Sequence, residues 1–564
     1  MNPKWQYTIN NSGEAEKLKE KYKLNDLLAL ILANRNINVD NAEVFLNPTR
    51  KDFHNPFDMP DMEKAVERII SAIDKKEKIT IYGDYDVDGI TSITTLKSFL
   101  EERGLEVEYY IPHRLNEGYG LNKEAVKKIA DNKTILMITV DCGITGIKEI
   151  EYAKSLGLDV IVTDHHEPGE NIPDAIAVID CKRKDNKYPF RELAGVGVVF
   201  KLIQAISIKL GLEEKEYLKY LDIVSIGTIS DIVPLKDENR VITKLGLKLV
   251  ECTRNFGLKA ILNNIGYNKI DSNSISFGVA PRINACGRMG YADVALDLLL
   301  SKNMKEAEKY VITLNTFNNE RQSKEKNILN EAISKVEKEN LEDENSIILA
   351  GKGWHSGVIG IVASKITDMY FKPCILFCFD NDSNIGKGSG RSIPGFDIHR
   401  ALLKCQADLV AFGGHSMAVG VAIEQDKIEK FKKDFSDIVE KADISNIVPI
   451  LNIDAILNID NITKEMVASL SKLEPFGEAN KMPIFVFKNL KIDSIRTLTE
   501  GKHLKLTLRS NNNTYVNAIG FNIGHLAENF VIGDRVDIAG CLEVNSFNGV
   551  DSIQINLKDI IKSI

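Results

Sequence analysis

Three short apolar runs in this chain each end in acidic or histidine residues, and this feature constrains the fold most. The runs occupy 79–82, 135–140 and 158–162, and they lead into 83–89, 141–143 and 163–169. Longer amphipathic stretches, such as 122–131, separate the runs, which favours a parallel sheet with crossover helices. Because ligands gather at the carboxyl ends of parallel strands, we expect these acids and histidines to meet at one sheet edge.

The residue composition and hydrophobic pattern change along the rest of the chain, which predicts further domains. The stretch 292–340 is rich in Lys, Glu and Asn and has neither Pro nor Gly, which indicates helix. A second, smaller α/β unit follows, and after Gly477 alternating short runs predict a small β-barrel or sandwich. The predicted parts are an N-terminal segment (1–70), an α/β lobe with a parallel sheet (71–290), a helical connector (291–342), a smaller α/β lobe (343–445) and a β-rich domain (446–564).

Composition places the chain among soluble globular proteins of about three or four domains, since 44% of its 564 residues are hydrophobic and 27% are charged. No apolar run approaches the ~18 residues that a membrane helix needs, and the N-terminus lacks the layout of a signal peptide. We therefore expect a cytoplasmic protein without a membrane partner, with its eight scattered cysteines reduced. The net charge of -8 argues against indiscriminate nucleic-acid binding but allows a local basic groove.

The acidic edge has the composition of a divalent metal site. Asp84, Asp86 and Asp88 alternate along an extended segment or tight turn, while Asp141 and His165 arrive from neighbouring strands. Carboxylates with one or two imidazoles favour Mn²⁺ or Mg²⁺, and two ions are the usual arrangement for generating hydroxide and stabilising the leaving oxygen in attack on phosphorus. Taken alone, the Asp-x-Asp-x-Asp-Gly run fits a solvated turn or a calcium-type loop equally well.

Two further residues remain ambiguous from the sequence. Asp231 follows an apolar helix-like stretch and fits either a metal ligand or a helix cap. His165 and His166 are adjacent after a strand, so one is expected to bind the metal while the other supports it or meets substrate. We favour His165 as the ligand.

These acidic motifs resemble, in order and spacing, those of the DHH phosphoesterase superfamily. Four later motifs, at 280–289, 353–360, 388–392 and 412–415, resemble the RecJ family of single-stranded-DNA-specific exonucleases within that superfamily. The resemblance covers nearly the whole chain. It implies a DHH lobe that holds two metal ions, usually Mn²⁺, a long helix, a DHHA1 lobe that grips the substrate, and an oligonucleotide-binding (OB) barrel.

The resemblance also implies a ligand set. The residues that it places on the metals are Asp86, Asp88, Asp141, His165 and Asp231, with Asp84 close to the first ion. Related pyrophosphatases have a histidine at the position of Tyr82, and a phenol is a poor ligand. Asp84 would replace that histidine, or the first site would bind weakly.

Residues for holding the nucleic acid follow from the same resemblance. Ser389 and Arg391 match candidates for binding a terminal phosphate, and Arg114 is placed to help, since arginine donates two hydrogen bonds to phosphate. The alternative for each arginine is a surface ion pair. The remaining candidates are Arg282 and Arg288 along the strand backbone, with an interlobe salt bridge as the alternative for Arg282, and His415 on a phosphate, with a buried structural histidine as the alternative. Tyr119 and Phe396 fit base stacking or, preferentially, core packing.

We expect a metal-dependent 5′-to-3′ exonuclease that degrades single-stranded DNA to 5′-mononucleotides in recombination and repair, with Asp141, His165 and His166 as catalytic residues. The alternatives are a phosphodiesterase for short oligonucleotides or cyclic dinucleotides, a non-catalytic DNA-binding replication scaffold, and a pyrophosphatase. The β-rich tail favours longer strands, and the intact carboxylates argue against a scaffold. The resemblance implies single-stranded DNA as partner, with single-strand-binding protein and a RecQ-type helicase as further candidates.

Overall fold

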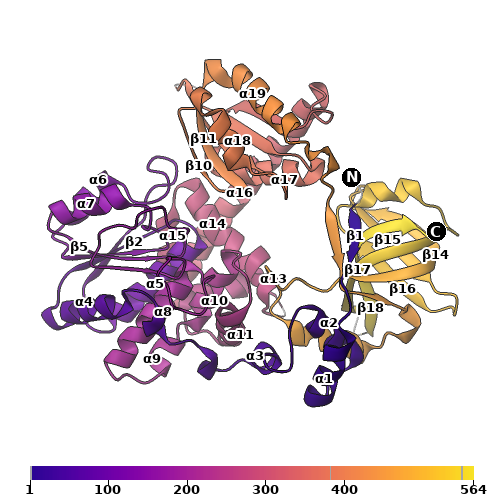
Figure 1. Cartoon of the computed structure of the whole chain (residues 1–564), viewed down its shortest axis with the longest axis horizontal. Coiled ribbons are helices and arrows are strands. Elements are labelled where there is room, and N and C mark those ends of the chain that lie inside the picture. The colour runs from indigo at the N-terminus through magenta and orange to yellow at the C-terminus, as the bar shows by residue number, and fades with distance from the viewer. Residues whose placement is uncertain (1–2, 268, 381–382, 548–549, 564) are drawn as a thin grey trace. The chain divides into compact units, whose positions relative to one another are not determined.

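The computed structural model describes residues 3–267, 269–380, 383–547 and 550–563 (Figure 1). It divides into a barrel unit, residues 1–49 with 448–564, and a two-lobe unit, residues 50–447. The expected N-terminal segment 1–70 is thereby split. Leu28 and Ile31 pack in the core of the barrel unit, whereas Val66 and Ile69 pack in the first lobe of the two-lobe unit.

The first lobe, residues 50–299, contains a five-stranded sheet of order β3-β2-β4-β5-β6 in which all neighbours are parallel. Its strands are β2 (Ile79–Gly83), β3 (Val107–Tyr110), β4 (Leu136–Val140), β5 (Asp159–Asp164) and β6 (Ala177–Asp180). β2, β4 and β6 are buried along their whole length, which is typical of a parallel sheet covered on both faces. The predicted parallel sheet is therefore confirmed.

Helices cover both faces of this sheet. One core contains Val66, Ile93 and Val199, and a second contains Val126 and Ile150. The helices are α4 (Met62–Lys75), α5 (Val87–Glu101) and α8 (Gly195–Lys209) on the first face, and α6 (Lys123–Asp131) and α7 (Ile147–Ser155) on the second. Further helices complete the lobe: α9 (Lys215–Leu218), α10 (Leu221–Ser230), α11 (Asp237–Val250), α12 (Phe256–Ile265), α13 (Ser272–Ser274), the π-helix η3 (Ile275–Val279), α14 (Ala280–Met289) and α15 (Ala292–Leu299).

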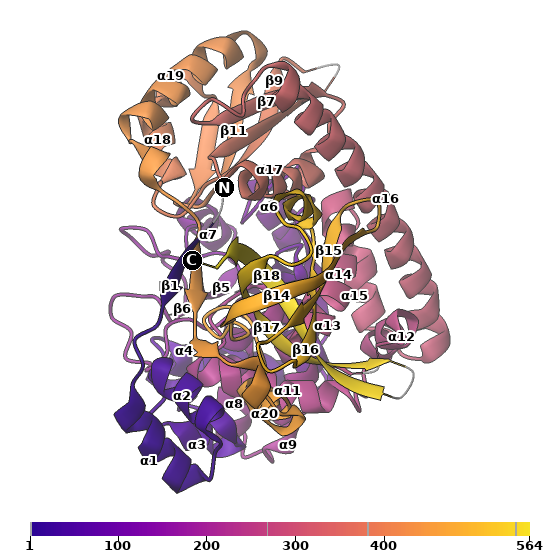
Figure 2. The same cartoon turned by 90° about the vertical axis from the view of Figure 1, so that its right-hand side faces the viewer.

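The predicted helical connector is present as α16 (Met304–Lys338), which spans 35 residues. Its first half contributes Val311 and Leu314 to the first-lobe core, and its second half contributes Ile328 and Val336 to a core of the second lobe. Figure 2 shows the helix running from one lobe to the other. One continuous helix thus belongs to both hydrophobic cores.

The second lobe, residues 347–447, is a five-stranded sheet of order β10-β11-β9-β8-β7. Its strands are β7 (Ile347–Lys352), β8 (Cys374–Phe379), β9 (Ile385–Arg391), β10 (Ala411–Gly414) and β11 (Ala418–Glu424). α17 (Ser356–Tyr370) packs with α16 on one face through Val358 and Val362. α18 (Ile398–Lys404) and α19 (Ile428–Lys441) pack on the other face through Leu402 and Phe435 (Figure 2).

The barrel unit confirms the predicted small β-barrel. The order β13-β14-β15-β16-β18-β17 closes through an additional pairing of β14 with β17. Its elements are β1 (Lys4–Tyr7), α1 (Ser12–Tyr22), α2 (Asp26–Asn34), α3 (Ala42–Leu46), β12 (Ile450–Ile453), β13 (Ala455–Leu457), α20 (Lys464–Ser469), β14 (Phe485–Leu498), β15 (His503–Arg509), β16 (Tyr515–Gly520), β17 (Arg535–Phe547) and β18 (Val550–Lys562). β1 pairs with β12, and the Trp5 indole donates to Asp559 at 2.7 Å. In the described part of the chain, no helix combines the length and apolarity needed to cross a membrane.

Candidate metal centre and phosphate pocket

The acidic run after β2 folds into a turn and the start of a helix. β2 ends at Gly83, and Asp86 is the N-cap of α5, where its side chain accepts from the Gly89 amide at 3.0 Å. Asp88 therefore lies in the first turn of α5, so of the two predicted arrangements, an extended segment or a tight turn, the structure forms the turn. A Cβ at Gly89 would lie 2.4 Å from the Asp84 carbonyl oxygen, which explains the glycine.

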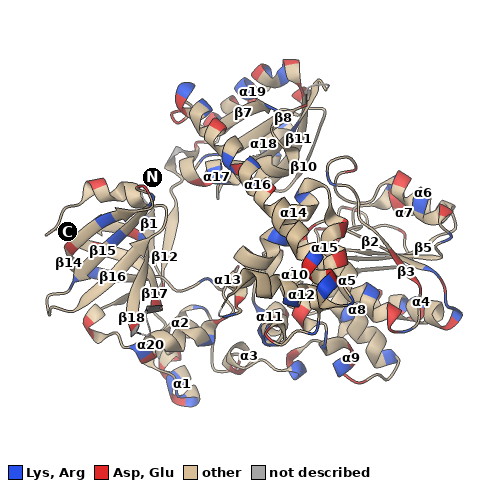
Figure 3. Cartoon of the chain, turned by 180° about the vertical axis from the view of Figure 1, so that it is seen from behind, with Lys and Arg blue, Asp and Glu red and all other residues tan. Residues whose placement is uncertain are grey.

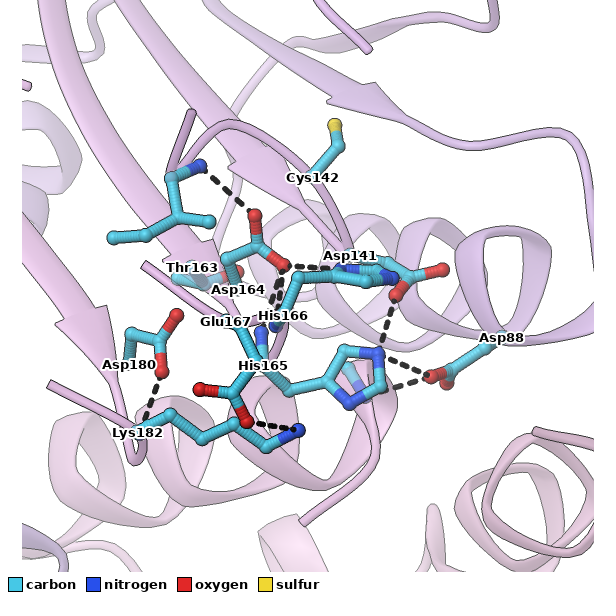
Figure 4. A network of polar contacts seen from close by, with 12 residues as sticks. Asp88, Asp141, Cys142, Thr163, Asp164, His165, His166, Glu167, Asp180 and Lys182 are labelled. Atoms are coloured by element: carbon cyan, nitrogen blue, oxygen red, sulfur yellow. Dashed lines mark hydrogen bonds and ion pairs between the residues drawn. The ribbon is translucent and has the colours of Figure 1, made fainter. Parts of the chain in front are cut away.

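Residues from three more elements converge on this turn, as Figure 4 shows for part of the group. His165, directly after β5, places Nε2 3.1 Å from Asp141 Oδ1, 3.6 Å from Asp231 Oδ2 and 3.9 Å from Asp88 Oδ2. Asp141 follows β4, and Asp231 is the C-cap of α10. Asp231 therefore both ends a helix and faces the histidine. The strand ends meet as the sequence predicts.

The side chains form overlapping groups with metal-binding geometry. One group is Asp84, Asp86 and Asp141, and another is Asp88, His165 and Asp231, with candidate ligand atoms within 4.8 Å of one another in each. The close approach of Asp141 to His165 links the two groups. A third combination joins Asp141, His165 and His166.

The electrostatics of the cluster fit cations. Burial and the charge of Asp86 raise the pKa of Asp84 well above its usual range and that of Asp88 to about 7. Burial also raises the pKa of Asp141 and, together with nearby His166, lowers that of His165 to about 3. Asp84 Oδ1, Asp141 Oδ1 and both His165 nitrogens are buried without a hydrogen-bond partner. Crowded carboxylates and a neutral imidazole, which offers the lone pair of one ring nitrogen, are a donor set for divalent ions.

His166 lies beside this cluster and is also held by Asp164. Its Nδ1 lies 2.7 Å from Asp164 Oδ1, and Asp164 also accepts from the backbone amides of Ile144 and His165 (Figure 4). Although burial opposes the charged form, the bond to Asp164 raises the pKa of His166 to about 9. The hydroxyl of Tyr119, an exposed residue, lies 3.2 Å from Nδ1. The sequence placed Asp164 at this strand end but gave it no role of its own.

Tyr82 belongs to none of the candidate ligand groups, although related pyrophosphatases have a histidine at its position. The side chain is fully buried, and its hydroxyl donates to the Gly120 carbonyl at 2.9 Å. Burial raises the pKa of the phenol above its usual value. Asp84 is the residue of this strand end whose carboxylate joins a ligand group.

Ser389 and Arg391 lie side by side on β9. Arg391 Nη1 donates to Ser389 Oγ at 3.0 Å and to the Gly390 carbonyl at 2.7 Å. Burial and the charge of Arg114 lower the pKa of Arg391, and no carboxylate of the described residues forms an ion pair with it. α17 comes close, since a Cβ at Gly360 would lie 2.9 Å from Ser389 Oγ. Within the described ranges, the surface ion pair considered for Arg391 is therefore absent.

Three arginines, Arg391 among them, lie around Arg288. Arg288 donates to the Gly357 carbonyl at 3.1 Å, and burial together with the charges of Arg114, Arg321 and Arg391 lowers its pKa to about 9. Arg114 stacks over the Tyr85 ring at 4.6 Å. Arg321 belongs to α16, where Glu325 accepts from it at 2.5 Å. A buried guanidinium with other guanidinium groups around it favours an anion beside it.

Three more residues were considered for contact with nucleic acid, and the structure shows where each of them lies: Arg282, His415 and Phe396. Arg282 donates to Asn315 at 2.9 Å and to the Gly278 carbonyl at 2.7 Å, so these bonds secure it on α14. His415 is exposed between β10 and β11, which excludes the buried structural histidine. Phe396 is buried against Phe435, with ring centroids 6.4 Å apart, and is a core residue.

The loop that carries Arg114 and Tyr119 belongs to the first lobe and also contacts the second. Glu117 holds the loop by accepting from Tyr110 and Asn122, each at 2.9 Å. Lys387, on the strand that carries Ser389 and Arg391, donates to the Leu115 carbonyl at 2.6 Å. The loop thus contacts the metal centre through Tyr119 and the second lobe through Leu115.

Comparison with known families matches three consecutive regions of the chain. Residues 78–228 match the DHH family, N-terminal domain, residues 343–441 match the DHHA1 domain, and residues 453–559 match the RecJ OB domain. These regions correspond to the parallel-sheet lobe, the second lobe and the barrel.

Similar proteins cover most of the chain. The single-stranded-DNA-specific exonuclease RecJ of Bacillus subtilis (strain 168) is 38% identical over 99% of this chain and 70% of its own length. The protein of the same name from Escherichia coli (strain K12) is 34% identical over 88% of this chain and 90% of its own. The crystal structure of RecJ with Mn²⁺ from Thermus thermophilus superimposes with a TM-score of 0.86 at 28% identity, covering all of this chain and 80% of that one.

Proposed function

Because this chain belongs to the RecJ family of single-stranded-DNA-specific exonucleases, we propose that it hydrolyses single-stranded DNA from the 5′ end and releases 5′-mononucleotides. The observation that carries the proposal is the buried cluster of carboxylates and His165 at the strand ends. We assign catalysis to 71–290, the connection to 291–342 and strand binding to 343–445 and 446–564. The rate of mononucleotide release tests this assignment. It is measured on single-stranded DNA, on a duplex of the same sequence and on dinucleotides, and it should be highest on single-stranded DNA.

Two divalent ions, Mn²⁺ or Mg²⁺, are proposed for the cluster. The support is the pair of ligand groups linked through Asp141 and His165, together with the Thermus thermophilus RecJ structures in complex with Mn²⁺ and with Mg²⁺. Asp84 and Asp86 would hold one ion, and Asp88 and Asp231 the other. Such ions, when bound, activate water and neutralise charge at the scissile phosphate. Titration of Mn²⁺ into the protein should give two sites, and Asp231→Asn should leave one.

The remaining residues of the centre are proposed to position the substrate. Protonated His166, oriented by Asp164, presents a positive charge beside the ligand groups and donates to a non-bridging phosphate oxygen. Tyr119 is exposed beside it and contacts the reacting nucleotide. Arg282 and His415 are proposed to contact the strand backbone further from the reacting phosphate. Single-strand-binding protein and a RecQ-type helicase are proposed partners on family membership, and co-purification tests them.

We propose that Ser389 holds the terminal 5′ phosphate of the strand together with four arginines, and that this contact sets the 5′ polarity. The arginines are Arg114, Arg288, Arg321 and Arg391. Arg391→Ala should reduce the rate advantage of a 5′-phosphorylated over a 5′-hydroxyl strand by about 10- to 100-fold, since a charge-assisted hydrogen bond is worth ~1.5–3 kcal/mol. Arg400→Ala, an exposed arginine on the same lobe, is the matched control. An unchanged ratio in Arg391→Ala would remove this residue from the phosphate pocket.

A substitution at Gly195 tests how closely the backbone packs against the carboxylate of Asp141. A Cβ at Gly195 would lie 2.6 Å from Asp141 Oδ1, so Gly195→Ala should displace that carboxylate and slow hydrolysis by about 10²-fold. Gly197→Ala, two residues further along α8, meets only the Leu193 side chain, at 3.3 Å, and should be nearly neutral. Equal rates for the two variants would show that Asp141 tolerates the displacement.

A further inference from the structure

The end of β6 brings a further carboxylate and a lysine to the edge where the metal centre lies. Asp180, the last residue of β6, pairs in register with Asp164 of β5, and Lys182 follows two residues later. Asp180 is fully buried and accepts from the Lys182 backbone amide at 2.6 Å, which fixes the turn that carries the lysine. Among the described residues, Asp180 belongs to none of the candidate ligand groups, so metal binding does not account for this strand end.

The side chain of Lys182 extends from this turn toward the metal centre. Figure 4 shows it below His165, with the ammonium group next to the Glu167 carboxylate. Only 18% of the lysine side chain is exposed. After the larger effects of burial and of neighbouring charges, the charge of Lys182 lowers the pKa of His165 and opposes the rise in the pKa of Asp231. A charge affects both residues only from close by, so Lys182 is a cation at the side of the cluster.

Glu167 is paired with Lys182, and the pair is loose. Glu167 Oε1 lies 3.5 Å from Lys182 Nζ, which is longer than the ~2.7–2.9 Å of a charge-assisted hydrogen bond. The Glu167 side chain is 67% exposed, and an ion pair with such an exposed partner contributes little to stability. A phosphate can therefore displace this carboxylate at a small cost in free energy.

The strand order places Lys182 beyond the cluster as seen from the phosphate pocket. The sheet runs β3-β2-β4-β5-β6, and its parallel strands end side by side at one edge. The loop after β3 carries Arg114 and contacts the second lobe, where Ser389 and Arg391 lie. β2, β4 and β5 lead into the ligand residues, and β6 leads into Lys182. The proposed terminal-phosphate pocket and Lys182 are therefore at opposite ends of this edge.

We propose that Lys182 binds the DNA phosphate that follows the scissile phosphate in the 3′ direction. The lysine exchanges Glu167 for a non-bridging oxygen of that phosphate, and Asp180 is a positioning residue that holds the lysine backbone. A strand anchored by its 5′ phosphate on the β3 side then passes over the cluster and leaves over β6. The inference rests on the proposed function and adds to it the path of the strand on the 3′ side of the cut.

Neutral linkages in the substrate test this contact directly. The substrate is a 5′-phosphorylated strand in which the second linkage, the one after the scissile linkage, is either a phosphate or an uncharged methylphosphonate, and release of the first nucleotide is measured. The neutral linkage should raise the KM of the wild type about tenfold, the lower end for a charge-assisted hydrogen bond, with kcat nearly unchanged. Lys182→Met should show the same loss on the native strand and no further loss on the modified one.

Three controls separate a phosphate contact from a structural role. Lys182→Arg keeps the charge and should restore most of the wild-type KM. Lys154→Met removes an exposed lysine of α7 that pairs with Asp174, and it should behave as the wild type on both strands (Figure 3). In chelator, where the strand is not cut, Lys182→Met should lower the slope of log affinity against log salt concentration by about 0.7, the value for one phosphate contact on a single strand.

The results that would overturn this assignment differ from those that would overturn the proposed function. An effect of the neutral linkage that persists in Lys182→Met would show that another residue binds that phosphate. Weaker Mn²⁺ binding or lower stability of Lys182→Met, in step with its loss of rate, would make the lysine a structural part of the centre. Either result overturns this inference and leaves the nuclease activity in place, whereas failure of the wild type to release any nucleotide overturns both.

Discussion

Asp141→Asn is expected to lower hydrolysis of single-stranded DNA by about 10⁴-fold or more, the scale of loss when a central catalytic group is removed. Asp141 joins both ligand groups, 3.1 Å from His165. Its φ of 58° is left-handed, a conformation that Asn tolerates better than most residues, so the change removes charge with little backbone strain. The rate of nucleotide release at saturating Mn²⁺ measures the effect, and affinity for single-stranded DNA should be largely retained.

Asp222→Asn is the matched control for this variant. Asp222 is a buried carboxylate of α10, the helix that ends at Asp231, but it bonds to Thr253 at 2.6 Å and lies in none of the ligand groups. Its substitution should leave the rate near wild type. Near-normal turnover in Asp141→Asn, or equal losses in both variants, would contradict the assigned centre.

Lys201→Met is expected to destabilise the two-lobe unit by about 3–5 kcal/mol, because it leaves a buried carboxylate without its cation. Lys201 and Glu238 are both fully buried, with Nζ 2.7 Å from Oε1. Glu238 also accepts from the Tyr188 hydroxyl and the His54 amide, so its charge is held in place once the lysine is gone. The shift of the denaturant midpoint for this unit measures the loss.

The double variant Lys201→Met/Glu238→Gln separates charge from packing. Gln removes the uncompensated charge and still accepts from Tyr188, so the double variant should be more stable than Lys201→Met alone. Activity per folded molecule should remain close to wild type, since neither residue lies in a ligand group. A loss within ~0.5 kcal/mol for Lys201→Met, typical of a surface position, would show that this pair carries no structural role.

The parts of the fold set by local patterns could be predicted from the sequence. The β-branched runs predicted a parallel sheet, and the shared polarity of parallel strands placed Asp141 and His165 at one edge. The helix-like spacing without Pro or Gly predicted the connector that α16 forms. Both predictions depend on residues close together in the chain, where periodicity carries the information.

Features that depend on distant segments could not be predicted. Arg321 joins the other arginines only because α16 passes beside α14, and one arginine in a charged helix gives no local signal. Packing of residues 1–49 with the barrel likewise joins sequence ends that no periodicity relates.

A time course on 5′-phosphorylated single-stranded DNA labelled at its 3′ end, with Mn²⁺ and with a chelator, decides whether this protein degrades DNA from the 5′ end. We expect progressively shorter products that keep the label until late, release of 5′-mononucleotides, and no reaction in the chelator. Early release of the labelled nucleotide, or an intact strand alongside cleaved dinucleotides, would contradict 5′-directed degradation of single-stranded DNA.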